Sequence, residues 1–187
     1  TAGSFARSSL LHLQEIGELK AIREHTSSRS GLQSFLFFIV VSGSGKLIYE
    51  EREFTLSPNS CVFVDCRNAY SHTTDPENLW TLRWCHFNGP TMTSIYNKYC
   101  ERGGRPVFIP HDSELLLRVL SELLSVAKSS DYMRDMIINE HLSTLTRLIM
   151  SESWHPEDKA LPVKKASVMD VKKYLDEKYG EKITLED

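Results

Sequence analysis

The chain has 187 residues, of which 41% are hydrophobic and 25% charged, as is ordinary for a globular protein with one core. Its formal net charge is −3, whereas a nucleic-acid surface needs clustered Lys and Arg, so the residues present do not favour such a surface. No apolar run reaches the ~20 residues of a membrane span, and we therefore expect no membrane partner.

Four cysteines, Cys61, Cys66, Cys85 and Cys100, are spaced neither as CxxC pairs nor as a dense disulfide framework. Three of them lie in expected strands, where a free thiol behaves as a small buried hydrophobic group. This usage is typical of a reducing compartment, so we expect a cytoplasmic protein.

The chain up to residue 110 is predicted to consist mainly of short strands. Residues 1–12 form an arm of small and polar residues, 10–22 two short strands broken at Gly17, and 26–31 a polar loop. The aromatic and β-branched run at 35–42 gives the strongest strand signal. Further strands are expected at 46–50, 53–56, 61–65, 72–74, 80–87 and 107–109. Short strands separated by regular turns predict an all-β barrel or sandwich.

After Pro110 the hydrophobic period changes from two to 3.6, which indicates helices. Asp112 or Ser113 can cap a helix to about residue 128, and Asp131 a longer helix to about residue 154. Residues 156–166 are rich in Pro and charge and are expected to form a linker.

The end of the chain has the pattern of a helix, a turn and the entry to a second helix. Ser167 can cap the start of the first helix, and Gly180 is expected to end it. Half of such a unit does not bury its apolar face alone, so we expect the sequence to be a fragment. Residues Tyr174, Leu175, Tyr179 and Ile183 to Asp187 resemble the start of the DNA-binding domain of AraC/XylS-family transcription regulators. The resemblance implies that 167–187 is the truncated start of a helix-turn-helix domain.

Segments of the strand-rich part also resemble this family, in its cupin-type sensor domain. They are Gly43-Ser44-Gly45, Leu56-Ser57-Pro58-Asn59-Ser60, Phe63-Val64-Asp65-Cys66 and Trp84-Cys85-His86-Phe87-Asn88-Gly89. The resemblance implies a mainly β fold with helices. A cupin-like barrel (a double-stranded β-helix or jelly roll) with an N-terminal arm spans 1–110, and a helical dimerisation segment spans 111–155. Asn59 replaces the usual turn glycine, a position where positive φ is expected.

Catalytic and metal chemistry have little support in the sequence. A cupin metal site needs a His-x-His pair, a Glu and a later His. The stretch where the pair is expected, residues 46–54 directly after Gly45, contains no His. His72 and His86 alone would be an incomplete metal shell. We therefore expect no cofactor and no enzyme activity, with a metal-dependent cupin enzyme (a sugar isomerase or dioxygenase) as the alternative.

The strand at 80–87 places Trp80, Leu82, Trp84 and His86 on one face, because side chains alternate along a strand. Two indoles and an imidazole need polar partners when buried, and an apolar cavity with a few polar groups is typical of a small-molecule site. A barrel core filled by these side chains is the alternative, which would leave a ligand-free dimerisation module.

The family resemblance implies that Trp84, Arg29, His72 and Tyr70 contact the ligand. Together with Trp80 and His86, which share a strand face with Trp84, the predicted ligand-binding residues are Arg29, Tyr70, His72, Trp80, Trp84 and His86. Aromatic faces stack on the C–H faces of sugars, so a sugar is the expected effector, although a small acid or an aromatic compound would also fit.

The resemblance further implies a homodimer through an antiparallel contact between the longer helices, with Met136, Glu140 and Arg147 at the seam. Ligand binding would then control DNA binding through the C-terminal domain of the full-length protein.

Overall fold

The computed structural model describes residues 2–153. The expected linker at 156–166 and the expected helix-turn-helix start at 167–187 lie outside the described residues. No helix within the described part is both long and apolar enough to cross a membrane.

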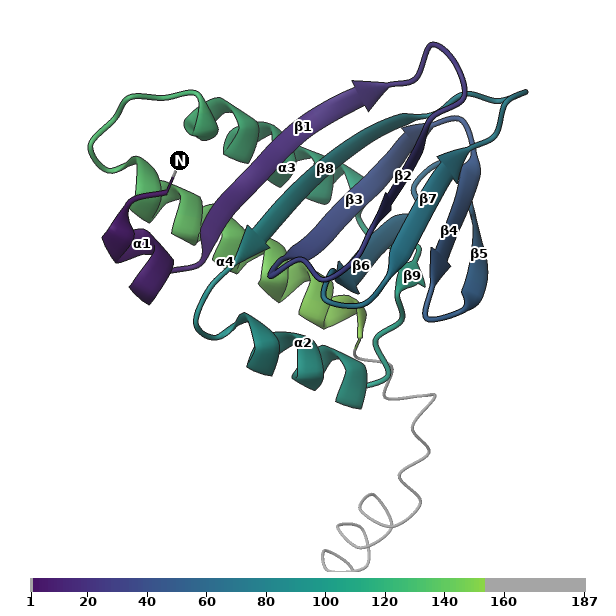
Figure 1. Cartoon of the computed structure of the whole chain (residues 1–187). Helices are drawn as coiled ribbons and strands as arrows, with labels where there is room; N and C mark the ends of the chain where they lie inside the picture. The colour runs from purple at the N-terminus through teal and green to yellow at the C-terminus, as the bar shows by residue number, and fades with distance from the viewer. Residues whose placement is uncertain (1, 154–187) are drawn as a thin grey trace, which may run out of the picture. The chain divides into compact units, whose positions relative to one another are not determined.

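Two antiparallel sheets form the body of the described part (Figure 1). The five-stranded sheet has the order β1 (His12–Lys20), β8 (Thr81–Asn88), β3 (Phe35–Ser42), β6 (Cys61–Asp65) and β9 (Val107–Phe108). The four-stranded sheet has the order β2 (Thr26–Arg29), β7 (Tyr70–Thr74), β4 (Gly45–Tyr49) and β5 (Arg52–Leu56). The sheets face each other as an open sandwich, and the expected barrel does not close.

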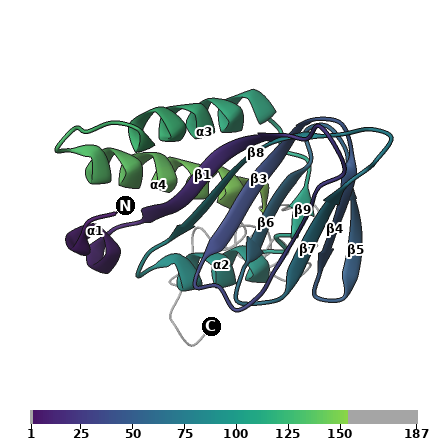
Figure 2. The same ribbon diagram turned by 45° about the horizontal axis from the view of Figure 1, so that its top comes forward.

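Helices cover the outer face of the five-stranded sheet (Figure 2). They are α2 (Met92–Glu101), α3 (Ser113–Ala127) and α4 (Arg134–Glu152), and a short helix, α1 (Ser4–Ser9), precedes β1. The side chain of Asp112 caps α3 by accepting a hydrogen bond of 2.9 Å from the backbone N–H of Leu115. The helical pair predicted after residue 110 is therefore present as α3 and α4.

The continuous apolar run of β3 has a simple cause, because this central strand is buried on both faces. Phe35, Phe37 and Ile39 pack against the helices, whereas Leu36, Phe38 and Val40 pack between the two sheets. Helices, sheet and sheet thus form three layers with two apolar interfaces. The second interface, between the sheets, contains the cavity that is lined by aromatic and histidine side chains.

The N-terminal part differs from the prediction in three places. Residues 4–9 of the expected arm form α1, and 12–20 form one strand rather than two. Gly17 does not interrupt this strand because it remains in register opposite Trp84 of β8; the irregularity lies between Leu13 and Glu15. Thr26–Arg29, expected to be loop, pairs with β7. Its sequence TSSR has no apolar alternation, since this edge strand buries little.

Two further differences concern the strand expected to begin at residue 72 and helix α2, which was not predicted. Strand β7 already begins at Tyr70. Helix α2 buries Met92, Tyr96 and Tyr99 at positions i, i+4 and i+7, so a helical period was present in the sequence and was missed. Asn59 has φ of 69°, so the expected positive φ at this turn is confirmed.

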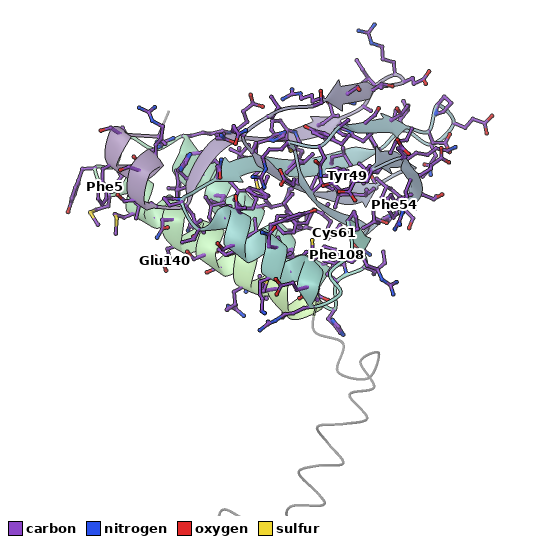
Figure 3. The ribbon with its side chains drawn as sticks, turned by 60° about the horizontal axis from the view of Figure 1, so that its bottom comes forward. Phe5, Tyr49, Phe54, Cys61, Phe108 and Glu140 are labelled. Carbon is purple, nitrogen blue, oxygen red and sulfur yellow. The ribbon has the colours of Figure 1, made fainter. Side chains whose placement is uncertain are left out.

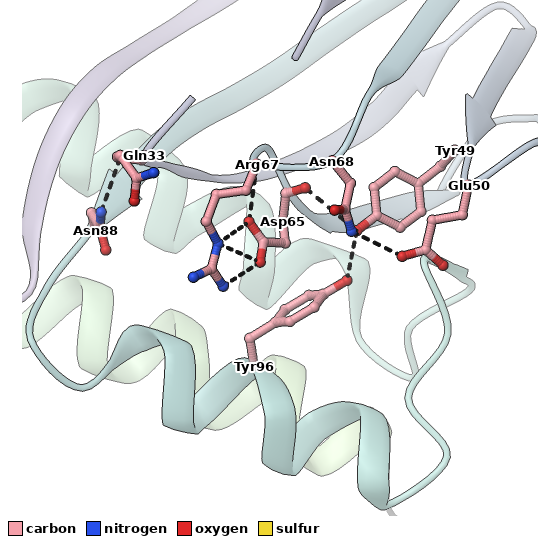
Figure 4. A network of polar contacts seen from close by, with 8 residues as sticks. All are labelled: Gln33, Tyr49, Glu50, Asp65, Arg67, Asn68, Asn88 and Tyr96. Carbon is pink, nitrogen blue, oxygen red and sulfur yellow. Dashed lines mark hydrogen bonds and ion pairs between the residues drawn. The ribbon is translucent and has the colours of Figure 1, made fainter. Parts of the chain in front are cut away.

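A polar network joins the ends of β4 and β6 to α2 (Figure 4). The hydroxyl of Tyr49 lies 3.3 Å from that of Tyr96 and accepts a hydrogen bond of 3.2 Å from the amide of Asn68. The buried carboxylate of Asp65 pairs with the guanidinium of Arg67. The network therefore connects both sheets and α2 through hydrogen-bonded groups rather than apolar contacts alone.

Candidate ligand-binding site

A cavity of about 220 Å³ lies between the two sheets, toward the edge formed by β1 and β2. The five-stranded sheet contributes mostly apolar and aromatic side chains, and the four-stranded sheet contributes mostly polar ones. The lining residues are Glu18, Leu19, His25, Ser27, Arg29, Leu36, Phe38, Tyr70, His72, Leu82, Trp84 and His86. One apolar wall facing one polar wall is suited to a small amphipathic molecule.

Five of the six residues predicted to contact ligand line this cavity: Arg29, Tyr70, His72, Trp84 and His86. They come from β2, β7 and β8, so the structure brings together residues up to 57 positions apart (86 minus 29).

The sixth predicted residue, Trp80, lies outside the cavity lining. Its side chain is fully buried just before β8, with its ring centroid 5.8 Å from that of His72 and 6.4 Å from that of Phe38. Strand alternation placed Trp80 on the correct face, but the hairpin at Gly43 and Gly45 covers it. The prediction that Trp80 contacts ligand is therefore not supported by its position.

Trp84 is positioned by the strand opposite it. Gly17 of β1 faces Trp84 across the strand pair, and a Cβ at residue 17 would lie 3.0 Å from the indole ring. The glycine leaves room for the indole to lie over β1. The indole is half-buried and packs edge-on against His86, with ring centroids 5.8 Å apart.

Two of the cavity histidines are neutral near pH 7. Burial lowers the pKa of His72 to about 4, with smaller contributions from the charges of His25, His86 and Arg29. Burial and then the charge of Arg29 lower the pKa of His86 to about 4 as well. His86 Nδ1 lies 3.0 Å from the hydroxyl of Ser34, so one of its nitrogens already has a partner.

His25 and His72 differ from His86 because the Nδ1 atom of each is buried without a hydrogen-bond partner among the described residues. Their rings lie near each other, with centroids 6.0 Å apart. Buried polar atoms are nearly always hydrogen-bonded, so these two nitrogens, like the buried indole nitrogen of Trp80, are exceptions among the polar atoms around the cavity.

The charge of Arg29 is balanced locally. Among the described residues that line the cavity, Arg29 is the only Arg or Lys, and its guanidinium lies 3.7 Å from the carboxylate of Glu15. The two side chains are about half exposed and link edge strand β2 to edge strand β1. Glu18, also at the lining, forms an ion pair of 2.7 Å with Arg83. The cavity therefore has no excess positive charge.

Sequence reasoning missed several residues of this site, among them His25, Glu15 and Phe38. Phe38 belongs to a strand that was predicted, but its direction relative to the second sheet was not. His25 precedes a strand without apolar alternation, and Glu15 meets Arg29 only through the sandwich geometry. Within residues 2–153, no three His, Cys, Asp or Glu side chains converge as metal ligands.

The residues predicted for a dimer seam, Met136, Glu140 and Arg147, are all exposed and lie on α4. With Ser143, which is also exposed, they follow one another at spacings of four, three and four residues. Residues so spaced share one helix face, so these four form a continuous exposed stripe along α4. We call them the α4 stripe.

A comparison with protein families identifies the class of the fold and cavity. Residues 14–145 match the family model described as the AraC-like ligand binding domain. The match covers more than half of the chain and all of the cavity lining. The chain belongs to the AraC-like ligand-binding domain family.

Solved structures with similar folds are distant in sequence. An apo form of a ToxT variant from Vibrio cholerae has a TM-score of 0.51 at 11% identity, covering 79% of this chain and 59% of that chain. The AraC-like transcriptional activator CuxR has a TM-score of 0.49 at 11% identity, covering 70% and 48%. A cupin protein from Bacteroides fragilis has a TM-score of 0.34 at 13% identity, covering 40% and 63%.

The chain thus spans about half to three fifths of the two regulators it resembles. Among curated proteins, none has a significantly similar sequence. The described residues have the mainly β fold with helices that was expected, and the two sheets are left open at their edges.

Proposed function

We propose that the cavity between the sheets binds a neutral, hydroxyl-rich small molecule, of which a sugar is the best example. The observation that supports this most is that the Trp84 indole and the imidazoles of His25, His72 and His86 line one cavity. An indole face stacks on apolar C–H groups, and a neutral imidazole either donates to or accepts from a hydroxyl. A ligand with both kinds of surface satisfies both walls.

The charge balance of the cavity favours a neutral ligand over a carboxylate. Arg29 is already close to Glu15, and the neutral forms of His72 and His86 add no positive charge near pH 7. A carboxylate would have to compete with Glu15 for the guanidinium and would bring an additional negative charge. A hydroxyl donates to Glu15 or accepts from Arg29 without breaking their pair.

The role we propose is effector sensing within an AraC-type transcription regulator, without a catalytic step. Ligand binding would favour one arrangement of the full-length protein and thereby change which DNA sites its C-terminal domain occupies. Such control requires only that the ligand bind one arrangement more tightly than the other. We propose that the protein acts in the cytoplasm.

The proposal is tested by following the melting temperature of the protein with neutral sugars, sugar acids and small aromatic acids. A ligand at one hundred times its dissociation constant adds about 2.7 kcal/mol of stability. We expect neutral sugars to give the largest shift, and Trp84→Ala to abolish it. Ile22→Ala, a substitution of an exposed side chain outside the cavity lining, is the control.

Other outcomes would point to the alternatives. A shift with sugar acids alone would contradict the charge argument, and no shift with any compound would favour a ligand-free dimerisation module. A stoichiometric metal found by elemental analysis, with metal-dependent turnover, would favour the cupin enzyme.

We further propose that the protein is a homodimer in which the α4 helices of two copies pack antiparallel along the α4 stripe. Glu140 and Arg147 are equally distant from the midpoint between Ser143 and Thr144, since 140 + 147 equals 143 + 144. A two-fold axis at this midpoint therefore places Glu140 of one copy opposite Arg147 of the other, twice per dimer.

This arrangement predicts a symmetric cross-link close to the axis. In a Cys100→Ser background, which removes the exposed native thiol, Ser143→Cys should form an intermolecular disulfide under mild oxidation. Ser125→Cys, at an exposed position on α3, should not. A monomer at all concentrations, or equal cross-linking by both variants, would contradict the proposed seam.

A further inference from the structure

Exposed apolar side chains gather where α4 begins. Four of the eight large apolar side chains exposed within residues 2–153 belong to this corner: Phe5 is 63% exposed, Tyr132 94%, Met133 41% and Met136 44%. We call these four residues the apolar corner. Aromatic and Met side chains left exposed together are typical of protein interfaces rather than of ordinary surface.

Helix α1 brings Phe5 to this corner through hydrogen bonds at both of its ends. The backbone N–H of Gly3 donates to the carboxylate of Asp135, and that of Leu11 donates to the amide oxygen of Asn139, each over 2.9 Å. Ala6 is buried beneath the helix, whereas Phe5 points outward at the same end of the molecule as Glu140 (Figure 3).

The hydrogen bonds also place α1 beside the α4 stripe. Asp135 and Asn139 are one helical turn apart, and Met136 and Glu140 follow each of them by one residue. Consecutive residues are about 100° apart around a helix, so the stripe lies next to the groove that α1 occupies. The apolar corner is therefore continuous with the stripe at the start of α4.

The α4 stripe alone is a poor interface core, because three of its four residues are polar or charged. Stable homodimers bury roughly 1,200 Å² or more, with an apolar centre. Antiparallel pairing brings the start of one α4 to the end of the other. Met150 is found there: it follows Arg147 by three residues and so lies on the same face of α4 as the stripe, with its side chain half-buried.

We propose that the apolar corner, including Phe5 of α1, is the outer part of the homodimer interface and packs against the end of α4 of a second copy. This inference rests on the proposed antiparallel dimer and extends it to the N-terminal helix. The two ends of the interface are apolar and its centre holds the Glu140–Arg147 pairs. The occupant of the corner is thus a second copy of this chain.

The test measures the dimer dissociation constant of the whole chain by analytical ultracentrifugation. Phe5→Ser and Tyr132→Ser should each weaken dimerisation about tenfold or more, as expected when an aromatic anchor is removed from an interface. Ile48→Ser is the matched control, because Ile48 is 48% exposed but belongs to β4 in the other sheet. Thermal melting of each variant verifies that it is folded.

The outcomes separate this inference from the dimer proposal itself. If the wild type dimerises and Glu140→Lys weakens the dimer while Phe5→Ser and Tyr132→Ser do not, the apolar corner is not part of the interface. A wild type that remains monomeric at all concentrations overturns both proposals. Weakening by Ile48→Ser equal to that by Phe5→Ser overturns the assignment to this corner.

Discussion

Gly17 lies directly opposite Trp84 across the β1–β8 pair, and the indole occupies the space that a side chain at residue 17 would need. The two residues are 67 positions apart in the sequence, and the absence of a side chain at Gly17 allows the Trp84 indole to lie where it does. Gly17 therefore shapes the candidate ligand site although it is not among the residues that line the cavity between the sheets.

Replacing Gly17 should move Trp84 and weaken ligand binding. A Cβ alone would lie 3.0 Å from the ring, which a small shift of the half-buried indole relieves, but a larger side chain displaces the ring. We expect Gly17→Ala to reduce affinity slightly and Gly17→Leu about tenfold or more, a loss of ~1.4 kcal/mol. Calorimetric titration with the effector checks the order, and equal affinities for Leu and wild type would contradict it.

Stability should fall as the pH is lowered from about 6.5 to about 4, because His72 and His86 have pKa values near 4 in the folded protein. In this window the unfolded chain binds protons that the folded protein does not. Each histidine then removes up to about 1.4 kcal/mol from the free energy of unfolding per pH unit. Below about pH 4 both states are protonated and these two histidines cause no further loss.

Urea unfolding at several pH values checks this expectation. His72→Gln should reduce the slope of unfolding free energy against pH, because the contribution of one histidine is removed. Carboxylates titrate at the lower end of the same range, so the difference between variant and wild type is the relevant quantity. An unchanged slope would mean that the His72 imidazole is accessible to protons in the folded state.

The parts of the fold that the sequence predicted are those in which burial leaves a pattern. β3 and β6 are buried on both faces and appeared as apolar runs, and α3 appeared through its period of 3.6. β2 was missed because an edge strand of sequence TSSR is held by backbone pairing with β7 rather than by apolar burial. The pattern of apolar side chains predicts elements that are buried, but it does not predict an element that is held by backbone hydrogen bonds alone.

The candidate site was predictable within single strands but not between sheets. Alternation along β8 correctly grouped Trp84 with His86, and the family resemblance added Arg29, Tyr70 and His72. Glu15 and His25 belong to the site only because the edges of two sheets meet, which depends on how the sandwich packs. Trp80 was grouped with them because alternation does not reveal which part of a face another hairpin covers.

The hairpin that covers Trp80 contains Gly45, and we expect substitution of this glycine to destabilise the protein. A Cβ at residue 45 would overlap the ring of Trp80 and the backbone carbonyl of Thr73, neither of which is free to move. Overpacking a core costs about 1–3 kcal/mol, and here backbone is also involved, so we expect Gly45→Ala to destabilise the protein by about 3 kcal/mol or more. Gly31→Asn is the comparison, because Gly31 has φ of 69° but open space around it. Equal, small losses in both variants would contradict this packing.

The Tyr49–Tyr96 contact should contribute to stability without affecting the ligand site. Burial raises the pKa of both hydroxyls, so they remain protonated and interact as neutral groups. Tyr49→Phe leaves the amide of Asn68 with only its 3.0 Å bond to Glu50 and leaves Tyr96 without its Tyr49 partner. We expect a loss of about 1–3 kcal/mol, and a smaller loss of about 1 kcal/mol for Tyr96→Phe.

The double variant should lose less stability than the sum of the two single losses, because both single substitutions break the same 3.3 Å contact. Chemical unfolding of the four proteins measures this coupling. Effector affinity should be the same in all four, since neither tyrosine lines the cavity between the sheets. Strictly additive losses would mean that the two hydroxyls bond separately to other groups, and reduced effector affinity would mean that this end of the sandwich sets the shape of the cavity.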